Sequence, residues 1–146
     1  MVKLKKKFET VDITTADVAI AAYGKNIEEL FENAALGMMN IITNTKKIKK
    51  NIKKDIKVDA NDLESLMFNW LNEILFYIDA YQLLFSKFKI KIEEIDNKKL
   101  ILQAICYGDR ITNNRYEIKT HIKAATYHNL KIEKNKVWKS IIIFDI

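Results

Sequence analysis

The chain has 146 residues, of which 49% are hydrophobic and 30% are charged. That length is enough to bury the core of one ordinary domain, and the balance excludes a disordered or fibrous chain. We therefore expect one domain over residues 1–146.

Export and membrane insertion are not expected for this chain. Its richest apolar stretch, residues 66–78, is shorter than the ~20 residues of a membrane-spanning helix and is interrupted by Asn69, Asn72 and Glu73. The basic N-terminus lacks the apolar segment of a secretory signal. The only cysteine is Cys106, which excludes an internal disulfide and a CxxC metal site. A cytoplasmic location fits these features.

The net charge of +6 comes largely from clustered lysines, near the start of the chain and again over residues 46–54. Such clusters attract an RNA backbone or an acidic protein surface through long-range electrostatics. A solvated loop is the alternative interpretation of residues 46–54.

The first half of the chain predicts two strands and two helices. Residues 8–23 are rich in β-branched residues and predict strand, with a break near residues 14–17. Asn26 followed by Glu29 indicates a capped helix that ends near residues 43–44. Residues 52–60 form the next predicted strand. A second helix follows, with Asn61 as its cap and an apolar stripe over about five turns to Ile78.

The second half changes to a period of two, which predicts strands over residues 85–94, 99–107, 121–133 and 137–145. Tight turns are expected at residues 96–97 and at Asn135, and an exposed loop over residues 108–116. The fold class is therefore α+β, a two-layer sandwich with two amphipathic helices on one face of a mixed or antiparallel sheet of about six strands. The last strand is apolar on both faces, which indicates a central position in the sheet.

Asp17 and Asp145 are the acidic residues most suggestive of a metal site. Asp145 follows a very apolar strand and precedes Ile146 with its α-carboxylate. A buried carboxylate is costly unless it meets a positive partner, and Ca²⁺ accepts oxygen ligands in a tolerant geometry. Asp17 could supply a further ligand. The alternative is that Asp17 caps a turn and Asp145 is solvated.

Candidate catalytic residues are few. His121 and His128 fall on opposite faces of one predicted strand, so they cannot chelate one ion, and His128 is expected to be partly buried. Cys106 and Ser65 have no nearby histidine in the sequence. There is no GxSxG motif and no phosphate-binding loop, and no exposed aromatic residues accompany the basic clusters. These features argue against an enzyme.

Several short strings, taken in order, resemble the archease family. They cover nearly everything from Phe8 onward and are the following: residues 15–18 (TADV), 22–24 (AYG), 31–38 (FENAALGM), 62–66 (DLESL), 70–73 (WLNE), 119–120 (KT), 123–124 (KA), 126–128 (TYH) and 145–146 (DI).

The resemblance implies a non-catalytic, chaperone-like protein cofactor of the tRNA-splicing RNA ligase. Such a protein promotes guanylylation of the ligase and multiple turnover, and its contact with RNA is indirect or weak. The resemblance also implies two helices packed on a sheet and a bound divalent cation, usually calcium, with Asp17, Asp145 and Ile146 as ligands. The family commonly has His before Thr-Ala-Asp, whereas this chain has Thr14.

The resemblance leaves the role of the acidic site open, because the carboxylates either hold a structural Ca²⁺ or touch the metal site of the ligase. Lys123, Thr126, Tyr127 and His128 are further candidates for the partner surface. One alternative function is a direct RNA-binding module or tRNA-modification chaperone that uses the lysines of residues 46–54. Another is a metal-dependent hydrolase, which would need an open coordination site.

Overall fold

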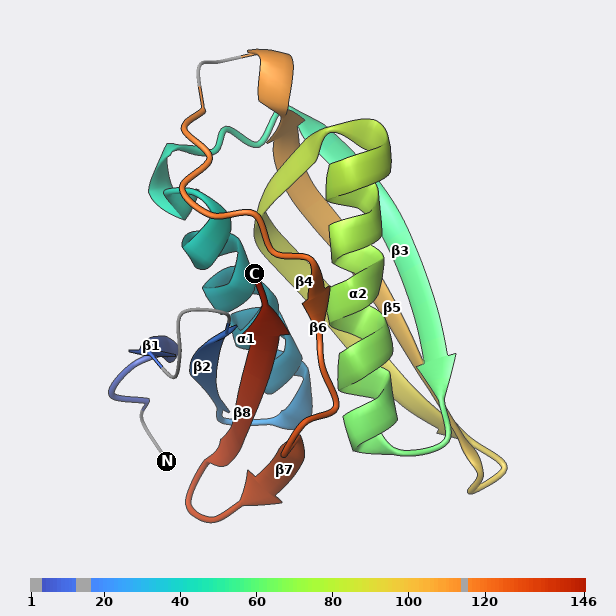
Figure 1. Cartoon of the computed structure of the whole chain (residues 1–146). Coiled ribbons are helices and arrows are strands. Elements are labelled where there is room, and N and C mark those ends of the chain that lie inside the picture. Colours follow the sequence, from blue (N-terminus) through green and yellow to red (C-terminus); the bar gives the residue numbers. More distant parts are fainter. Residues whose placement is uncertain (1–3, 13–16, 114–115) are drawn as a thin grey trace.

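The computed structural model describes residues 4–12, 17–113 and 116–146 (Figure 1). Over these residues the elements follow in this order: β1 (Phe8–Asp12), β2 (Asp17–Gly24), α1 (Ile27–Ile42), the 3₁₀ helix η1 (Thr45–Lys47), β3 (Ile52–Ala60), α2 (Leu63–Tyr81), β4 (Leu83–Ile95), β5 (Lys99–Arg110), the 3₁₀ helix η2 (Ile111–Asn113), β6 (Ala124–Ala125), β7 (Lys131–Lys134) and β8 (Trp138–Asp145).

The strands form two antiparallel sheets. Sheet A has the order β1-β2-β8-β6, with β7 also paired to β8, and sheet B has the order β3-β5-β4. The predicted α+β class, with two helices packed on antiparallel strands, is confirmed. The eight strands of the described residues exceed the expected six and are divided between two sheets, because periodicity predicts strands but not their partners. β8 is central in sheet A, as its apolar sequence predicts.

Helix α1 lies between the two sheets, packed on β1, β2 and β8 on one side and on β4 on the other (Figure 1). Its capping prediction is confirmed: the Asn26 side chain accepts from the Glu29 N–H at 2.8 Å, and the Glu29 carboxylate accepts from the Lys25 N–H at 2.9 Å. Gly37 allows a close approach to sheet A, because a Cβ there would lie 2.9 Å from the Ile20 side chain. The helix is therefore buried on most of its surface.

Helix α2 packs across β3, β4 and β5 and completes the core. Trp70 is fully buried, and its Nε1–H donates to the Phe31 carbonyl at 3.0 Å, which ties α2 to α1. The cap of α2 is Asp62 and not Asn61, because the Asp62 carboxylate accepts from the Ser65 N–H at 2.7 Å. None of the described helices is both long and apolar enough to span a membrane.

The β4–β5 hairpin turns where the sequence predicts. Three residues connect Ile95 to its partner Lys99, and the first two, Asp96 and Asn97, have φ of 53° and 55°, positive values that Asp and Asn tolerate. Farther along, the register shifts between Phe85 and Lys87, where β4 passes Gly108 of β5. A Cβ at Gly108 would overlap the main chain of Leu84, so glycine is required at this crossing.

Two predictions about the C-terminal half are wrong. Residues 121–133 form no continuous strand, because β6 and β7 are separated by a turn in which Asn129 has φ of 53°. Residues 108–116 are no simple exposed loop either. β5 continues to Arg110, and the fully buried Asp109 accepts hydrogen bonds from Asn113 and from the Tyr116 hydroxyl.

Candidate metal and partner site

Pairing between β2 and β8 places Asp17 directly opposite Asp145. In an antiparallel pair, opposite residues share a face and their Cβ atoms lie about 5 Å apart. Asp145 is exposed and Asp17 is partly buried. The alternation of β8 puts Asp145 on the outer face of sheet A, away from the buried Phe144. The two carboxylates predicted to converge are therefore neighbours at one end of the sheet.

The end of β8 is held from its other side as well. Ala124 of β6 lies opposite Asp145, and the Lys123 N–H donates to the Asp145 carbonyl at 2.8 Å. Ile146 is partly buried and packs against the hydrophobic core. Asp145 and Ile146 are thus fixed in position between β2 and β6.

The paired carboxylates have the chemistry of a cation site. Like charges directly opposite on neighbouring strands repel, and a cation between them removes that repulsion. Oxygen donors favour a hard cation such as Ca²⁺. Among the described residues no group of three or more His, Cys, Asp and Glu side chains is arranged to hold a metal. Within the part of the chain that the structure describes, further ligands would be the Ile146 carboxylate, main-chain carbonyls or water. Thr14 lies outside the described residues.

The four predicted partner residues occupy one segment beside this site. Thr126 binds β8 twice, because its N–H and its hydroxyl both donate to the Ile143 carbonyl, at 3.0 and 2.9 Å. Tyr127 is half-exposed and stacks on Phe68 of α2, with ring centroids 4.0 Å apart. Lys123 and His128 are exposed. The segment therefore presents a lysine, an aromatic ring and an imidazole next to the carboxylates.

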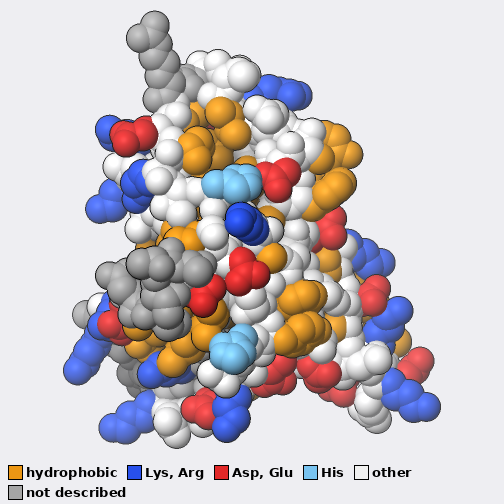
Figure 2. All heavy atoms as spheres, in the orientation of Figure 1, with side chains coloured by type: hydrophobic (Ala, Val, Ile, Leu, Met, Phe, Trp, Pro, Cys, Tyr) orange, Lys and Arg blue, Asp and Glu red, His pale blue; other side chains and the backbone are white. Residues whose placement is uncertain are grey.

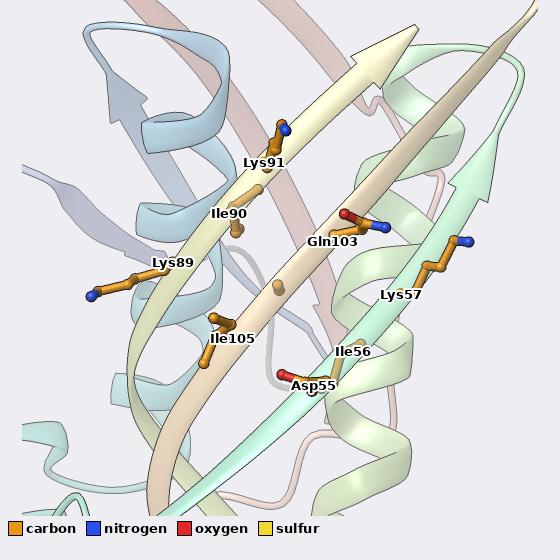
Figure 3. A pocket seen from close by; sticks show the side chains of 9 residues that line it. Asp55, Ile56, Lys57, Lys89, Ile90, Lys91, Gln103 and Ile105 are labelled. Carbon is orange, nitrogen blue, oxygen red and sulfur yellow. The ribbon is translucent and has the colours of Figure 1, made fainter. Parts of the chain in front are cut away.

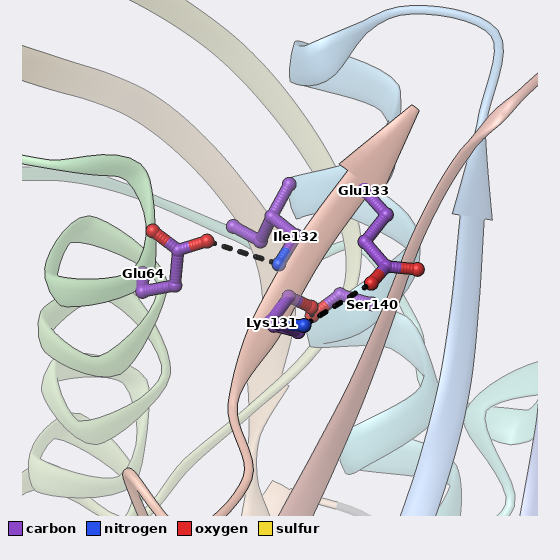
Figure 4. A network of polar contacts seen from close by, with 5 residues as sticks. All are labelled: Glu64, Lys131, Ile132, Glu133 and Ser140. Atoms are coloured by element: carbon purple, nitrogen blue, oxygen red, sulfur yellow. Dashed lines mark hydrogen bonds and ion pairs between the residues drawn. The ribbon is translucent and has the colours of Figure 1, made fainter. Parts of the chain in front are cut away.

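Helix α2 protects the free edge of sheet A. The Asn72 side chain accepts from the Ala125 N–H at 2.9 Å and donates to the Ala125 carbonyl at 3.2 Å, as a neighbouring strand would. The first turn of α2 makes a similar contact with β7: the Glu64 carboxylate accepts from the Ile132 N–H at 3.0 Å (Figure 4). Sequence reasoning did not assign a role to Asn72. The signal was a polar residue next to the apolar stripe.

The histidine predictions are wrong in their geometry. His121 and His128 do not share a strand, and His128 is exposed instead of partly buried, because it lies in the turn between β6 and β7. Two histidine side chains are visible on the face shown in Figure 2, where acidic side chains are scattered and most Lys and Arg side chains lie toward the rim.

Cys106 is unsuited to nucleophilic chemistry. It is fully buried on β5, and burial raises the pKa of its thiol to about 12, with a further contribution from the nearby Asp55 carboxylate. Because the thiolate is the reactive form, the thiol is inert at neutral pH.

The lysines of residues 46–54 do not form one surface. Lys46 and Lys47 belong to η1, and alternation along β3 sends Lys53 and Lys54 to opposite faces of sheet B. Lys54 lies over the rings of Tyr77 and Tyr81 on α2. The predicted basic patch is therefore divided among three environments.

Comparison with known proteins gives a consistent result. The family model described as the Archease protein family matches residues 8–146. Protein archease of Sulfurisphaera tokodaii is 41% identical over 88% of this chain and 89% of its own length. Protein archease of Pyrococcus furiosus is 41% identical over 90% of this chain and 94% of its own. The solution structure of Methanobacterium thermoautotrophicum protein 1598 is 37% identical, covers 96% of this chain and 99% of that one, and superimposes with a TM-score of 0.84. The chain belongs to the archease family.

Proposed function

We propose that this archease is a non-catalytic, chaperone-like cofactor of a tRNA-splicing RNA ligase, which promotes guanylylation of the ligase and multiple turnover. The observation that supports this proposal is the pairing of Asp17 with Asp145 beside the exposed segment of residues 123–128. The arrangement offers a partner a charged surface built on a rigid sheet. Of the two candidate nucleophiles, Cys106 is fully buried and the pKa of its thiol is raised, so it is not activated.

The metal proposal is that Asp17, Asp145 and the Ile146 carboxylate hold a divalent cation, with calcium as the preferred ion. A bound cation supplies positive charge that offsets the two carboxylates. The chain's own part is to fix those carboxylates, through β2 on one side of β8 and β6 on the other. Lys123, Thr126, Tyr127 and His128 form the proposed surface toward the ligase.

Multiple-turnover RNA ligation with and without the protein tests the activator proposal. We expect stimulation at substoichiometric amounts, and its loss in Asp17→Asn and Asp145→Asn. Glu94→Gln is the matched control, because Glu94 is an exposed acid of sheet B, on β4 next to the β4–β5 turn. If the unaltered protein gives no stimulation, the activator proposal is rejected. If both site variants stimulate normally, the carboxylates have been assigned wrongly.

Calcium titration of the isolated protein separates the two possible roles of the site. A structural ion binds without the ligase, and Asp145→Asn then weakens binding by at least about tenfold, the lower end of what even an indirect partner of a metal ligand contributes. If the isolated protein binds no calcium while Asp145→Asn still abolishes stimulation, the carboxylates act on the metal site of the ligase.

A further inference from the structure

The outer face of sheet B is an open platform that no described helix covers, since α2 lies against its inner face (Figure 1). Its buried residues, such as Ile56, Phe88 and Leu102, point to the core, and the residues that alternate with them are exposed or half-exposed. An open hollow of about 590 Å³ lies on this outer face (Figure 3).

The strand register fixes which side chains share this face. Three successive cross-strand rows carry five lysines and one aspartate in the flanking positions, and they read as follows: Lys53, Tyr107 and Lys87; Asp55, Ile105 and Lys89; Lys57, Gln103 and Lys91. The next row is acidic, because Ile101 there lies between Asp59 and Glu93. The lysine platform, meaning these three rows, is therefore a bounded positive area.

The lysines of the platform are largely available for a ligand. Of the described ion pairs, the one that involves these five lysines is Lys91 with Glu93, and both side chains are more than half exposed. Exposed pairs of this kind are weak and easily exchanged. Lys87 and Lys89 lie over the Tyr107 ring, each 5.8 Å from its centroid.

We propose that the lysine platform binds single-stranded RNA along β5. Lys87, Lys89 and Lys91 repeat every second residue of β4, about 6.6 Å apart at a rise of about 3.3 Å per residue, and form a line of cations for successive phosphates. Between the flanking strands, β5 offers the Ile105 side chain and the partly buried Tyr107 ring for base faces. A base that stacks on Tyr107 takes the place of the Lys87 and Lys89 ammonium groups, which turn from the ring to the phosphates. A positive groove combined with an aromatic platform is how single strands are bound without sequence preference.

An acidic protein segment is the competing occupant, and the central strand argues against it. Such a segment would use the lysines but has no bases to place on Tyr107. Gln103, between Lys57 and Lys91, can also donate to and accept from base edges. RNA therefore uses all three strands of the platform, whereas an acidic peptide uses only the two outer ones.

Fluorescence anisotropy of the isolated protein tests the proposal without any ligase, so its outcome is independent of the activator proposal. The probes are a mixed-sequence 12-nucleotide RNA and a 12-residue polyglutamate peptide. We expect the triple variant Lys57→Gln, Lys89→Gln and Lys91→Gln to flatten the slope of log affinity against log salt by about 2, because each phosphate that a lysine neutralises adds about 0.7 to that slope. The matched control removes the same charge from Lys46, Lys47 and Lys49.

The Tyr107→Leu variant tests base stacking separately from charge. It keeps all five lysines, so the salt slope is unchanged, while RNA affinity falls by roughly fivefold or more because the bases no longer stack on the ring. Circular dichroism checks that each variant is folded. Equal losses in the two triple variants would overturn the proposal, as would a polyglutamate peptide that binds as tightly as RNA through the same lysines.

Discussion

Cys106 shows how burial at a single residue couples to pH. The pKa of its thiol is raised from 9.0 to about 12, so the folded chain keeps the proton where the unfolded chain loses it. The contribution of this thiol to the free energy of unfolding is therefore complete below pH 9 and is lost as the pH rises from 9 toward 12. Tyr23 acts in the same direction: burial and a 2.7 Å hydrogen bond to Glu9 raise its pKa from 10.0 to about 12.

We expect the free energy of unfolding to fall between about pH 8 and about pH 11, and to fall less in Cys106→Ala, which keeps the contribution of Tyr23 but loses that of the thiol. Urea titration at both pH values measures the difference. In parallel, the native thiol should resist a thiol reagent at the lower pH and react once urea unfolds the chain. Rapid reaction in the native protein would show that Cys106 is accessible and that the pKa argument is wrong.

Single residues were predictable where local chemistry decides, as with Asn26 at the start of α1. Asp17 and Asp145 were identified as acids beside a turn and at the end of an apolar strand that could share a cation, and the resemblance implied the same ligands. Their shared position depends on the pairing of β2 with β8, which brings together opposite ends of the sequence. No local pattern contains that register.

The start of α2 offers a sharp test of helix capping. Asp62 accepts from the Ser65 N–H, whereas the sequence favoured Asn61 one residue earlier. Asp62→Ala should lower the free energy of unfolding by about 1 kcal/mol through loss of the cap. Asn61→Ala is the matched control, and we expect almost no change. Urea unfolding of both variants compares them, and a larger loss for Asn61→Ala would contradict the cap seen here.

At the scale of elements, the sequence predicted regular structure well and short strands poorly. The helical repeat of apolar residues in α2 specifies a helix, and the alternation of apolar and polar residues in β4 specifies a strand. β6 has two residues, and it is a strand only because β8 lies on one side and Asn72 on the other. The lysine alternation of residues 87–91 was visible in the sequence, but its companions on β3 and β5 come from tertiary pairing.

Across the whole molecule, Asn72 joins the helical layer to sheet A. Ala125 is buried, so Asn72→Ala would leave its N–H and carbonyl without their side-chain partner, at a cost of about 2 kcal/mol. We also expect faster hydrogen exchange in residues 123–127. Asn69→Ala removes an exposed hydrogen bond to Asp59 from the same helix and should cost much less. Equal losses in the two variants would show that the contact between Asn72 and β6 adds nothing.

The division of the strands into two sheets is the main feature of the whole fold that the sequence left open. The same amphipathic patterns would be buried in either of two architectures. In one, a single sheet lies under two helices, and in the other, two sheets enclose α1. The distinction depends on α1 being buried against both sheets, with Gly37 against sheet A and the Glu32 carboxylate accepting from the Ile90 N–H of β4 at 3.0 Å. The roles of Gly37 and Glu32 can be recognised only when it is known that both sheets pack against α1.

Because α1 is inserted between the sheets, the carboxylate pair and the lysine platform face away from each other. Adjoining layers pack at about 10 Å, so the two surfaces are roughly 20 Å apart. If both proposals hold, neither ligand displaces the other, and one archease molecule holds the ligase and its RNA in a ternary complex.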